Sequence, residues 1–123
     1  MPASTEEFAS RMQLLFETTL EAYIEHRALL MVVVREETDT QGVLDYSKAF
    51  AEFLERAKGE GFVREQLNSV MTTGAIIDRI LNQVSFAPQV KRVYGADIIS
   101  DSDYRQRWCK SNIDLFLNGI ATR

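Results

Sequence analysis

The sequence has few of the residues that build disulfides and metal centres. Its 123 residues include one cysteine, Cys109, and one histidine, His26. A single cysteine excludes an internal disulfide and a cysteine-based zinc site, and a single histidine excludes a histidine-rich metal site. One cysteine is also compatible with a reducing compartment.

Long hydrophobic runs and dense positive charge are missing as well. The apolar run 29–34 is much too short to cross a bilayer, and the acidic start around Glu6 and Glu7 lacks the hydrophobic region of a secretory signal. Residues 1–60 carry twelve acids and six bases, and residues 61–123 carry six acids and eight bases. Neither half has the basic face of a nucleic-acid binder. We therefore expect a soluble, cytoplasmic protein without a membrane segment.

Motifs of common enzyme classes are also absent. The chain has no Gly-x-Ser-x-Gly, no Walker-type loop and no Gly-x-Gly-x-x-Gly. Glu21 and Glu25 share a predicted helix face, but the second half lacks the Glu-x-x-His pattern of carboxylate metal sites. Arg105, four positions before Cys109, could lower the pKa of that thiol, although a core cysteine is the interpretation that we favour. We predict neither enzyme activity nor a cofactor.

What is present is the composition of one soluble domain. Apolar residues make up 46% and charged residues 26% of the chain, as in ordinary globular proteins. A chain of this length can bury a core without disulfides or metals. We expect residues 1–123 to form a single domain.

Apolar residues recur at three- and four-residue steps, which predicts helices. The first helix is expected to begin near residue 5, because Ser4 and Glu7 form a capping-box pattern. The run 28–34 is apolar on nearly every side and is predicted as a buried second helix, since no partner strand is apparent for the alternative of a buried strand. A third helix is predicted from Val43 to Ala57.

The second half predicts two longer helices with an irregular segment between them. Gly59 and Gly61 offer the positive-φ positions that end the third helix, and Phe62 is expected to pack back against it. The next helix is predicted over 63–84, and the last over about 102–121, capped by Asp101 or Ser102. Pro88 and Gly95 break the segment between them, with a short helical turn at 89–94. The predicted fold is all-α, with five main helices.

The first helices carry side chains that are typical of a small-molecule pocket, with apolar walls and a few polar groups. Aromatic residues and methionines at helical spacing equally describe a plain core, and composition leaves both interpretations open. The candidate pocket residues are Met12, Phe16, Tyr23, His26, Met31, Phe50 and Phe53.

The order of these helices and two local sequences resemble the C-terminal regulatory domain of TetR-family transcriptional regulators. The local sequences are the Gly-Phe-Val-Arg turn at 61–64 and Phe-Leu-Asn-Gly-Ile at 116–120, and the resemblance covers essentially the whole chain. It implies that the helices over about 64–84 and 102–121 pair with their copies in a four-helix dimer interface. It also implies that the first three helices enclose an effector pocket.

The predicted helices add their own support for a homodimer, because both have wide apolar stripes and twofold dimers are the commonest oligomers. Gly74 would permit a close helix crossing, although a neutral glycine is an equal alternative. The candidate interface residues are Leu67, Met71, Gly74, Ile77, Leu81, Trp108 and Phe116.

The family's N-terminal helix-turn-helix has no counterpart in these residues, so DNA binding is expected only through a domain absent from this chain. We expect an effector-sensing and dimerisation domain whose small apolar or amphipathic ligand would control that domain. The alternative is a stand-alone helical interaction protein that pairs with a full-length regulator. The gene's upstream sequence would distinguish the two.

Overall fold

The computed structural model describes the backbone of residues 4–28 and 41–120, and the side chains of residues 4–28 and 46–119. This part of the chain contains five helices and no strand, which confirms the all-α prediction. The helices are α1 (Thr5–Glu25), α3 (Gln41–Gly59), α4 (Ser69–Ser85), α5 (Ala87–Tyr94) and α6 (Ser102–Ile120). The predicted helix over 28–34 lies almost entirely outside the described residues.

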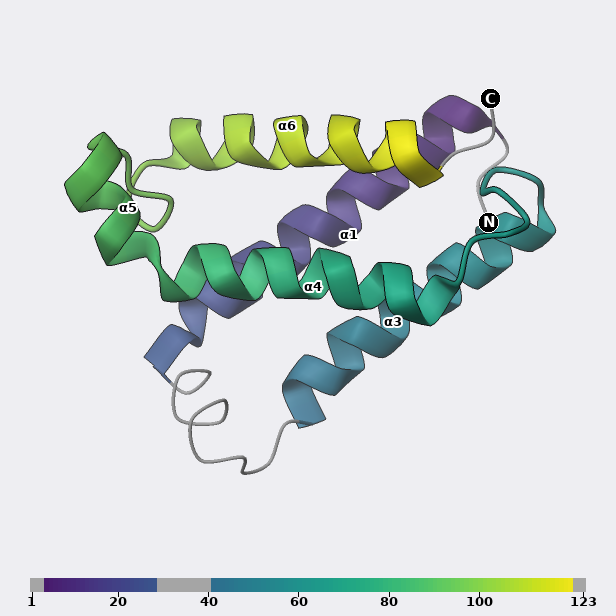
Figure 1. Ribbon diagram of the computed structural model, residues 1–123, viewed down its shortest axis with the longest axis horizontal. Helices are drawn as coiled ribbons and strands as arrows, with labels where there is room; N and C mark the ends of the chain where they lie inside the picture. The colour runs from purple at the N-terminus through teal and green to yellow at the C-terminus, as the bar shows by residue number, and fades with distance from the viewer. Residues whose placement is uncertain (1–3, 29–40, 121–123) are drawn as a thin grey trace.

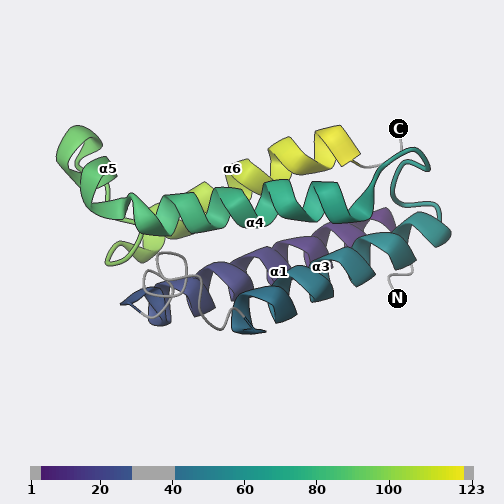
Figure 2. The same cartoon turned by 60° about the horizontal axis from the view of Figure 1, so that its bottom comes forward.

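The helices form two layers. Helices α1 and α3 lie side by side in one layer, and α4 and α6 lie in the other (Figures 1 and 2). Helix α1 contacts α3, α4 and α6, and therefore connects the two layers, while α3 also contacts α4. The short helix α5 packs only at the end of α4 and joins it to α6.

Side-chain caps explain where two of these helices begin. The Ser4 hydroxyl accepts a hydrogen bond from the Glu7 amide at 3.1 Å, as the capping pattern predicts. Asp101 caps α6, because its carboxylate accepts from the amides of Asp103 and Tyr104 at 3.1 Å each. Of the two predicted caps, Asp101 is therefore the one the chain uses.

Helix α4 begins later than the sequence predicted. The carboxamide of Asn68 accepts from the Met71 amide at 2.9 Å, so the helix starts at Ser69 and the predicted start at 63 is wrong. Residues 60–68 form a turn in which Gly61 has a φ of 84°, a conformation that costs little only without a side chain. Gly59 instead ends α3 without a positive φ.

The predicted break after α4 is confirmed. Helix α4 ends at Ser85, and Pro88 occupies the first turn of α5, where a missing amide hydrogen costs nothing. Gly95 ends α5 with a φ of 72°. The short helix starts at Ala87, two residues before the predicted turn.

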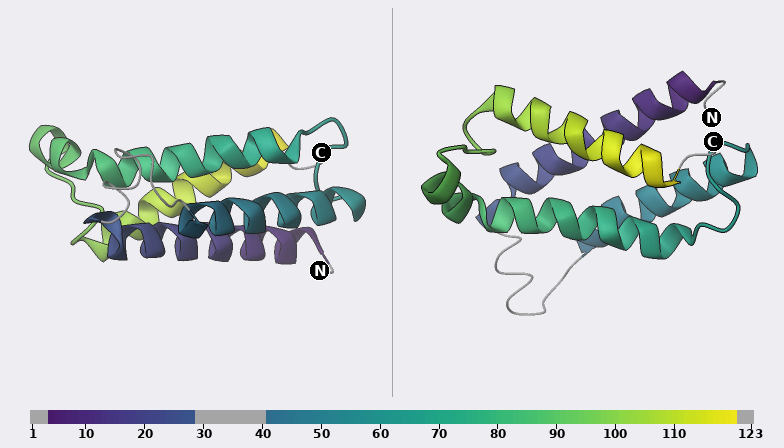
Figure 3. Two further views of the ribbon diagram at one scale, coloured as in Figure 1. Left: turned by 90° about the horizontal axis from the view of Figure 1, so that it is seen from below. Right: turned by 45° about the horizontal axis from the view of Figure 1, so that its top comes forward.

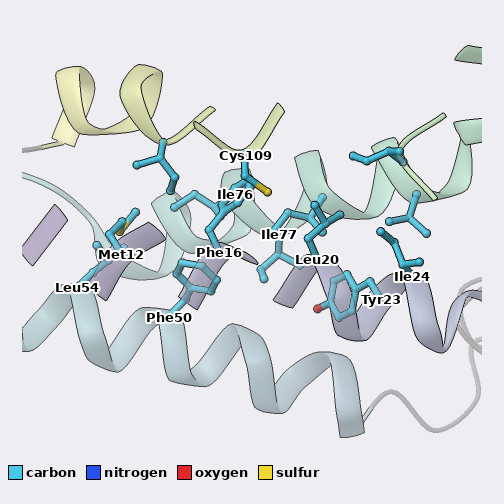
Figure 4. Packing of buried hydrophobic residues seen from close by; sticks show 14 of the residues in the cluster. Met12, Phe16, Leu20, Tyr23, Ile24, Phe50, Leu54, Ile76, Ile77 and Cys109 are labelled. Carbon is cyan, nitrogen blue, oxygen red and sulfur yellow. The ribbon is translucent and has the colours of Figure 1, made fainter. Parts of the chain in front are cut away.

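The core lies between the two layers and is built mainly of aromatic and branched side chains (Figure 4). Each such residue stabilises the fold by about 1.5–3 kcal/mol when fully buried. Helix α1 contributes along its whole length, because its buried positions recur every three or four residues. The largest fully buried hydrophobic residues are Phe8, Phe16, Phe50, Met12, Leu20, Leu54, Ile76, Ile80, Ile98 and Val63.

The core-facing side of α4 differs from its predicted apolar stripe. Two polar residues, Ser69 and Thr73, are buried, whereas Val70 and Met71 are exposed. The side of α4 that the hydrophobic pattern favours is therefore not the same as the side that packs against the core. Small polar residues can occupy buried helix positions close to a neighbouring helix, and Ser69 does so by donating to Glu55 on α3 at 2.6 Å.

Candidate functional site

Three of the predicted pocket residues are core residues. Met12, Phe16 and Phe50 are fully buried and lie among the other interior side chains (Figure 4). The Phe16 ring contacts Trp108 and Phe116 on α6, with ring centroids 5.6 and 6.4 Å apart. These contacts are the ones that a plain core makes.

The other pocket candidates lie in three different settings. Phe53 is half-buried and stacks on Phe8, with centroids 5.7 Å apart. His26 is exposed at the end of α1, where its amide donates to the Ala22 carbonyl. Met31 lies outside the described residues. Of the two that the structure describes, Phe53 lies beside Phe8 near the start of α1 and His26 lies at its end, so they do not line one cavity.

Tyr23 is the pocket candidate with an unusual polar group. Its side chain is 2% exposed, and its hydroxyl has no hydrogen-bond partner in the described part of the chain. Its ring meets Tyr46 of α3 edge to face, with centroids 5.8 Å apart. Burial, and secondarily the nearby Tyr46, raises the pKa of Tyr23 to about 12. An unpaired buried hydroxyl costs about 1–3 kcal/mol, so this group is suited to a ligand that offers an acceptor.

The predicted interface residues are divided between the core and the surface. Ile77 is 4% exposed and faces the core, so this chain's own packing occupies it. Trp108 and Phe116 are half-buried against Phe16, and Met71 is 75% exposed. The remaining candidates are Leu67 and Leu81, which are partly buried against the core, and Gly74.

Gly74 does not mark a close helix contact within the described part of this chain. A Cβ atom added there would meet nothing within 4 Å, and Gly74 has no positive φ. Of the two sequence interpretations, a tolerated glycine fits the single chain. A close approach would have to come from a second molecule.

The outer face of α4 carries the surface feature that sequence reasoning missed. An open hollow of about 410 Å³ lies along it, and Phe86 at its end is 54% exposed. Asp78 and Arg79 sit at its middle, and the Arg79 Nε donates to Asn112 of α6. The spacing of Met71, Ala75, Asp78 and Asn82 contained this signal. The hollow is lined by Ala75, Asp78, Arg79, Asn82, Gln83 and Phe86.

A second, much smaller hollow lies between α1 and α6. Its volume is about 60 Å³, and it is lined by Glu17, Glu21, Arg105, Gln106 and Cys109. Burial raises the pKa of Cys109 to about 12, with Glu17 and Glu21 adding to the rise and Arg105 opposing it. The thiol is therefore protonated near neutral pH and unsuited to nucleophilic chemistry.

The described residues contain no group of three or more histidine, cysteine or acidic side chains placed to hold a metal ion. Among the helices whose structure is described, none combines the length and apolar character needed to cross a membrane.

Comparison with protein-family models, with curated proteins and with solved structures found no match to this chain.

Proposed function

We propose that this chain is the dimerisation and effector-sensing domain of a TetR-like transcriptional regulator, with the layer formed by α4 and α6 facing a second subunit. The observation that carries the proposal is exposed apolar surface in this layer. Met71 and Phe86 at the two ends of α4 are 75% and 54% exposed, and Leu115 on α6 is 61% exposed. Large exposed apolar side chains among polar ones are typical of interaction surfaces.

The charge of this surface favours a protein partner over nucleic acid. Asp78 and Arg79 in the middle of α4 cancel each other's charge, and Asp114 on α6 lies near Lys110 in sequence. A surface that binds phosphates carries an excess of lysine and arginine. We therefore assign no DNA contact to these helices.

Tyr23 supports the effector-sensing part of the proposal. Its hydroxyl is buried without a partner among the described residues, and its ring meets that of Tyr46. Ligand sites commonly combine such a polar group with apolar surroundings. An amphipathic ligand with a hydrogen-bond acceptor would satisfy the hydroxyl. Its binding would alter the contact between α1 and α3, since Tyr46 lies on α3.

Sedimentation velocity at micromolar concentration tests the proposal as a whole. We expect a dimer, and a monomer over this range would contradict the dimerisation role. A native mass spectrum of gently purified protein tests the sensing role, for which we expect a retained small molecule. A spectrum that shows only polypeptide, together with no shift in melting temperature across a panel of amphipathic acids and esters, would count against an effector site.

Replacing Tyr23 by phenylalanine is expected to raise the free energy of unfolding by up to about 1 kcal/mol, because it removes a buried hydroxyl that has no partner among the described residues. The pH dependence should change as well. The unfolded state loses the tyrosine proton near the model value of 10.0, while the folded state keeps it until about 12. The part of the wild-type free energy of unfolding that depends on this raised pKa is therefore fully present below pH 10 and is lost as the pH rises through 12.

Urea denaturation at pH 7 and across the alkaline range measures both effects. Tyr46→Phe is the matched control, since Tyr46 is only half-buried and its hydroxyl is not a buried group that lacks a hydrogen-bond partner. A loss of 1 kcal/mol or more in Tyr23→Phe would mean that the hydroxyl has a partner after all. If Tyr23→Phe retained as much ligand as the wild type, the Tyr23 hydroxyl would not take part in effector binding.

A further inference from the structure

The outer face of α4 has a symmetric order of residues about its midpoint. Asp78 and Arg79 are adjacent near the centre of the helix, and both are exposed. Ala75 lies three positions before Asp78, and Asn82 lies three positions after Arg79. Met71 and Phe86, which are both exposed apolar residues, lie seven positions before and seven positions after the same pair.

These positions lie on the side of α4 that faces away from the core. Successive residues of an α-helix are rotated by about 100°, which places Met71, Ala75 and Asn82 opposite the buried Ile76 and Ile80. The core-facing positions and the outer positions of α4 are therefore distinct sets. Figure 3 shows α4 along one side of the molecule, with the α1 and α3 layer behind it.

We propose that α4 pairs antiparallel with α4 of a second copy of this chain, about a twofold axis that passes between Asp78 and Arg79. Each Arg79 then reaches Asp78 of the partner subunit. This inference rests on the dimerisation role proposed above and specifies the residues and register of the contact. In a twofold contact, every pair of residues occurs twice with the copies exchanged.

Self-complementarity identifies the second copy as the occupant. In the antiparallel arrangement Ala75 meets Asn82 of the partner subunit, a small residue against a larger one. Met71 likewise meets Phe86 of the partner subunit, an exposed apolar residue against another. The central acid and base also complement themselves when the helix is reversed. A different protein would have to reproduce this order, whereas a second copy has it by symmetry.

The hollow on the outer face fits this occupant. Phe86 lines one end of the hollow, and Met71 of the partner subunit arrives at that same end. Methionine is unbranched and flexible, so it can fill an irregular apolar space beside an aromatic ring. The hollow of about 410 Å³ is open to solvent in the single chain and would be covered by the second helix.

The structure also holds Arg79 in a position to cross the axis. Its Nε donates to the Asn112 side chain on α6, and Asn112 is in turn fixed by donating to the Trp108 carbonyl at 2.8 Å. Only one of the five guanidinium hydrogens is used in this bond, so the two terminal nitrogens can reach a carboxylate. The two Asp78 carboxylates approach each other near the axis, and the two arginines compensate that repulsion.

Charge variants test the ion pairs. Asp78→Arg places four cations at the axis, and Arg79→Asp places four anions there. Each variant alone is expected to raise the Kd of the homodimer by about tenfold or more. An equimolar mixture of the two variants should recover a dimer of mixed composition, since each acid then faces a base. Native mass spectrometry distinguishes this heterodimer from either homodimer by mass.

Glu60→Arg is the matched control for Asp78→Arg. It makes the same change of charge at an exposed position in the turn after α3, so its Kd should equal that of the wild type. Circular dichroism verifies folding, which matters for Arg79→Asp because that variant also loses the Asn112 hydrogen bond.

Engineered cysteines test the register without changing any charge. A mixture of Ala75→Cys and Asn82→Cys chains is expected to form an intermolecular disulfide rapidly, because the two positions face each other. Either variant alone should not, since two copies of the same position lie about 10 Å apart along the helices, beyond the Cα separation of about 4.4–6.8 Å that a disulfide needs. Native Cys109 is buried and does not compete.

The outcomes separate this inference from the role on which it rests. A wild-type monomer at micromolar concentration would overturn both. A wild-type dimer whose Kd responds to Asp78→Arg no more than to Glu60→Arg, and which shows no preferred disulfide between positions 75 and 82, would overturn the α4 register alone. The dimerisation role would then stand on another part of the surface.

Discussion

Replacing Phe16 by alanine is expected to lower the free energy of unfolding by about 3–5 kcal/mol, a large part of the total of about 5–15 kcal/mol that small domains possess. Phe16 is fully buried, and the centroid of its ring lies 5.6 Å from that of Trp108 and 6.4 Å from that of Phe116. The substitution therefore leaves a cavity between α1 and α6 and removes two aromatic contacts. Helix α6 loses both ring contacts through which Phe16 attaches it to α1.

Urea denaturation measures this effect with two probes. Trp108 is the only tryptophan in the chain, so its fluorescence reports the docking of α6, while circular dichroism reports total helix. The matched control is Leu14→Ala, an apolar residue of the same helix that is 64% exposed, for which we expect a change below about 0.5 kcal/mol. Equal effects of the two substitutions would show that Phe16 does not fill the core.

Several helix boundaries followed the sequence because a local cap or turn residue defines them. Ser4 and Asp101 cap helices through their own side chains. Gly61 adopts the predicted positive φ, and Gly95, which was predicted as a break, ends α5. Such features depend on a few neighbouring residues and can be predicted locally. The start of α4 was missed because Leu67 extended the apolar pattern across the true cap at Asn68.

Packing partners could not be predicted in the same way. The apolar pattern of α4 placed Met71 among the candidate interface residues but did not reveal that the core takes Ser69 and Thr73 while Val70 and Met71 are exposed. Hydrophobic periodicity reports which side of a helix is most apolar, and tertiary packing decides which side is buried.

The candidate site depended on knowing that packing. Trp108 and Phe116 were predicted to face a second subunit, but the sequence could not reveal that Phe16 of the same chain meets them. Asp78 and Arg79 were not among the candidate interface residues, because their place on the outer face follows only when the opposite side of α4 is known to be buried. The midpoint symmetry of that face is visible in the sequence once its orientation is known.

Replacing Phe8 by alanine is the second substitution with a large expected effect, again about 3–5 kcal/mol of unfolding free energy. Phe8 is fully buried and stacks on Phe53 of α3 and on Phe62 of the following turn, with centroids 5.7 and 5.8 Å away and nearly parallel rings. Such aromatic contacts contribute about 0.5–1.5 kcal/mol each beyond burial. The loss should exceed that of Phe62→Ala, because Phe62 is only half-buried.

Phe8→Ala and Asp78→Arg should affect self-association for different reasons, and comparing them tests that distinction. Phe8 stabilises the turn that leads into α4, so its loss should reduce dimerisation only in proportion to the fraction of chains that remain folded. Asp78 is exposed and outside the core, so its reversal should weaken the dimer while the unfolding curve measured below the dimer Kd stays unchanged. If Phe8→Ala raised the Kd of the dimer under conditions in which every chain is folded, the outer face of α4 would depend on the α1 and α3 layer for its shape.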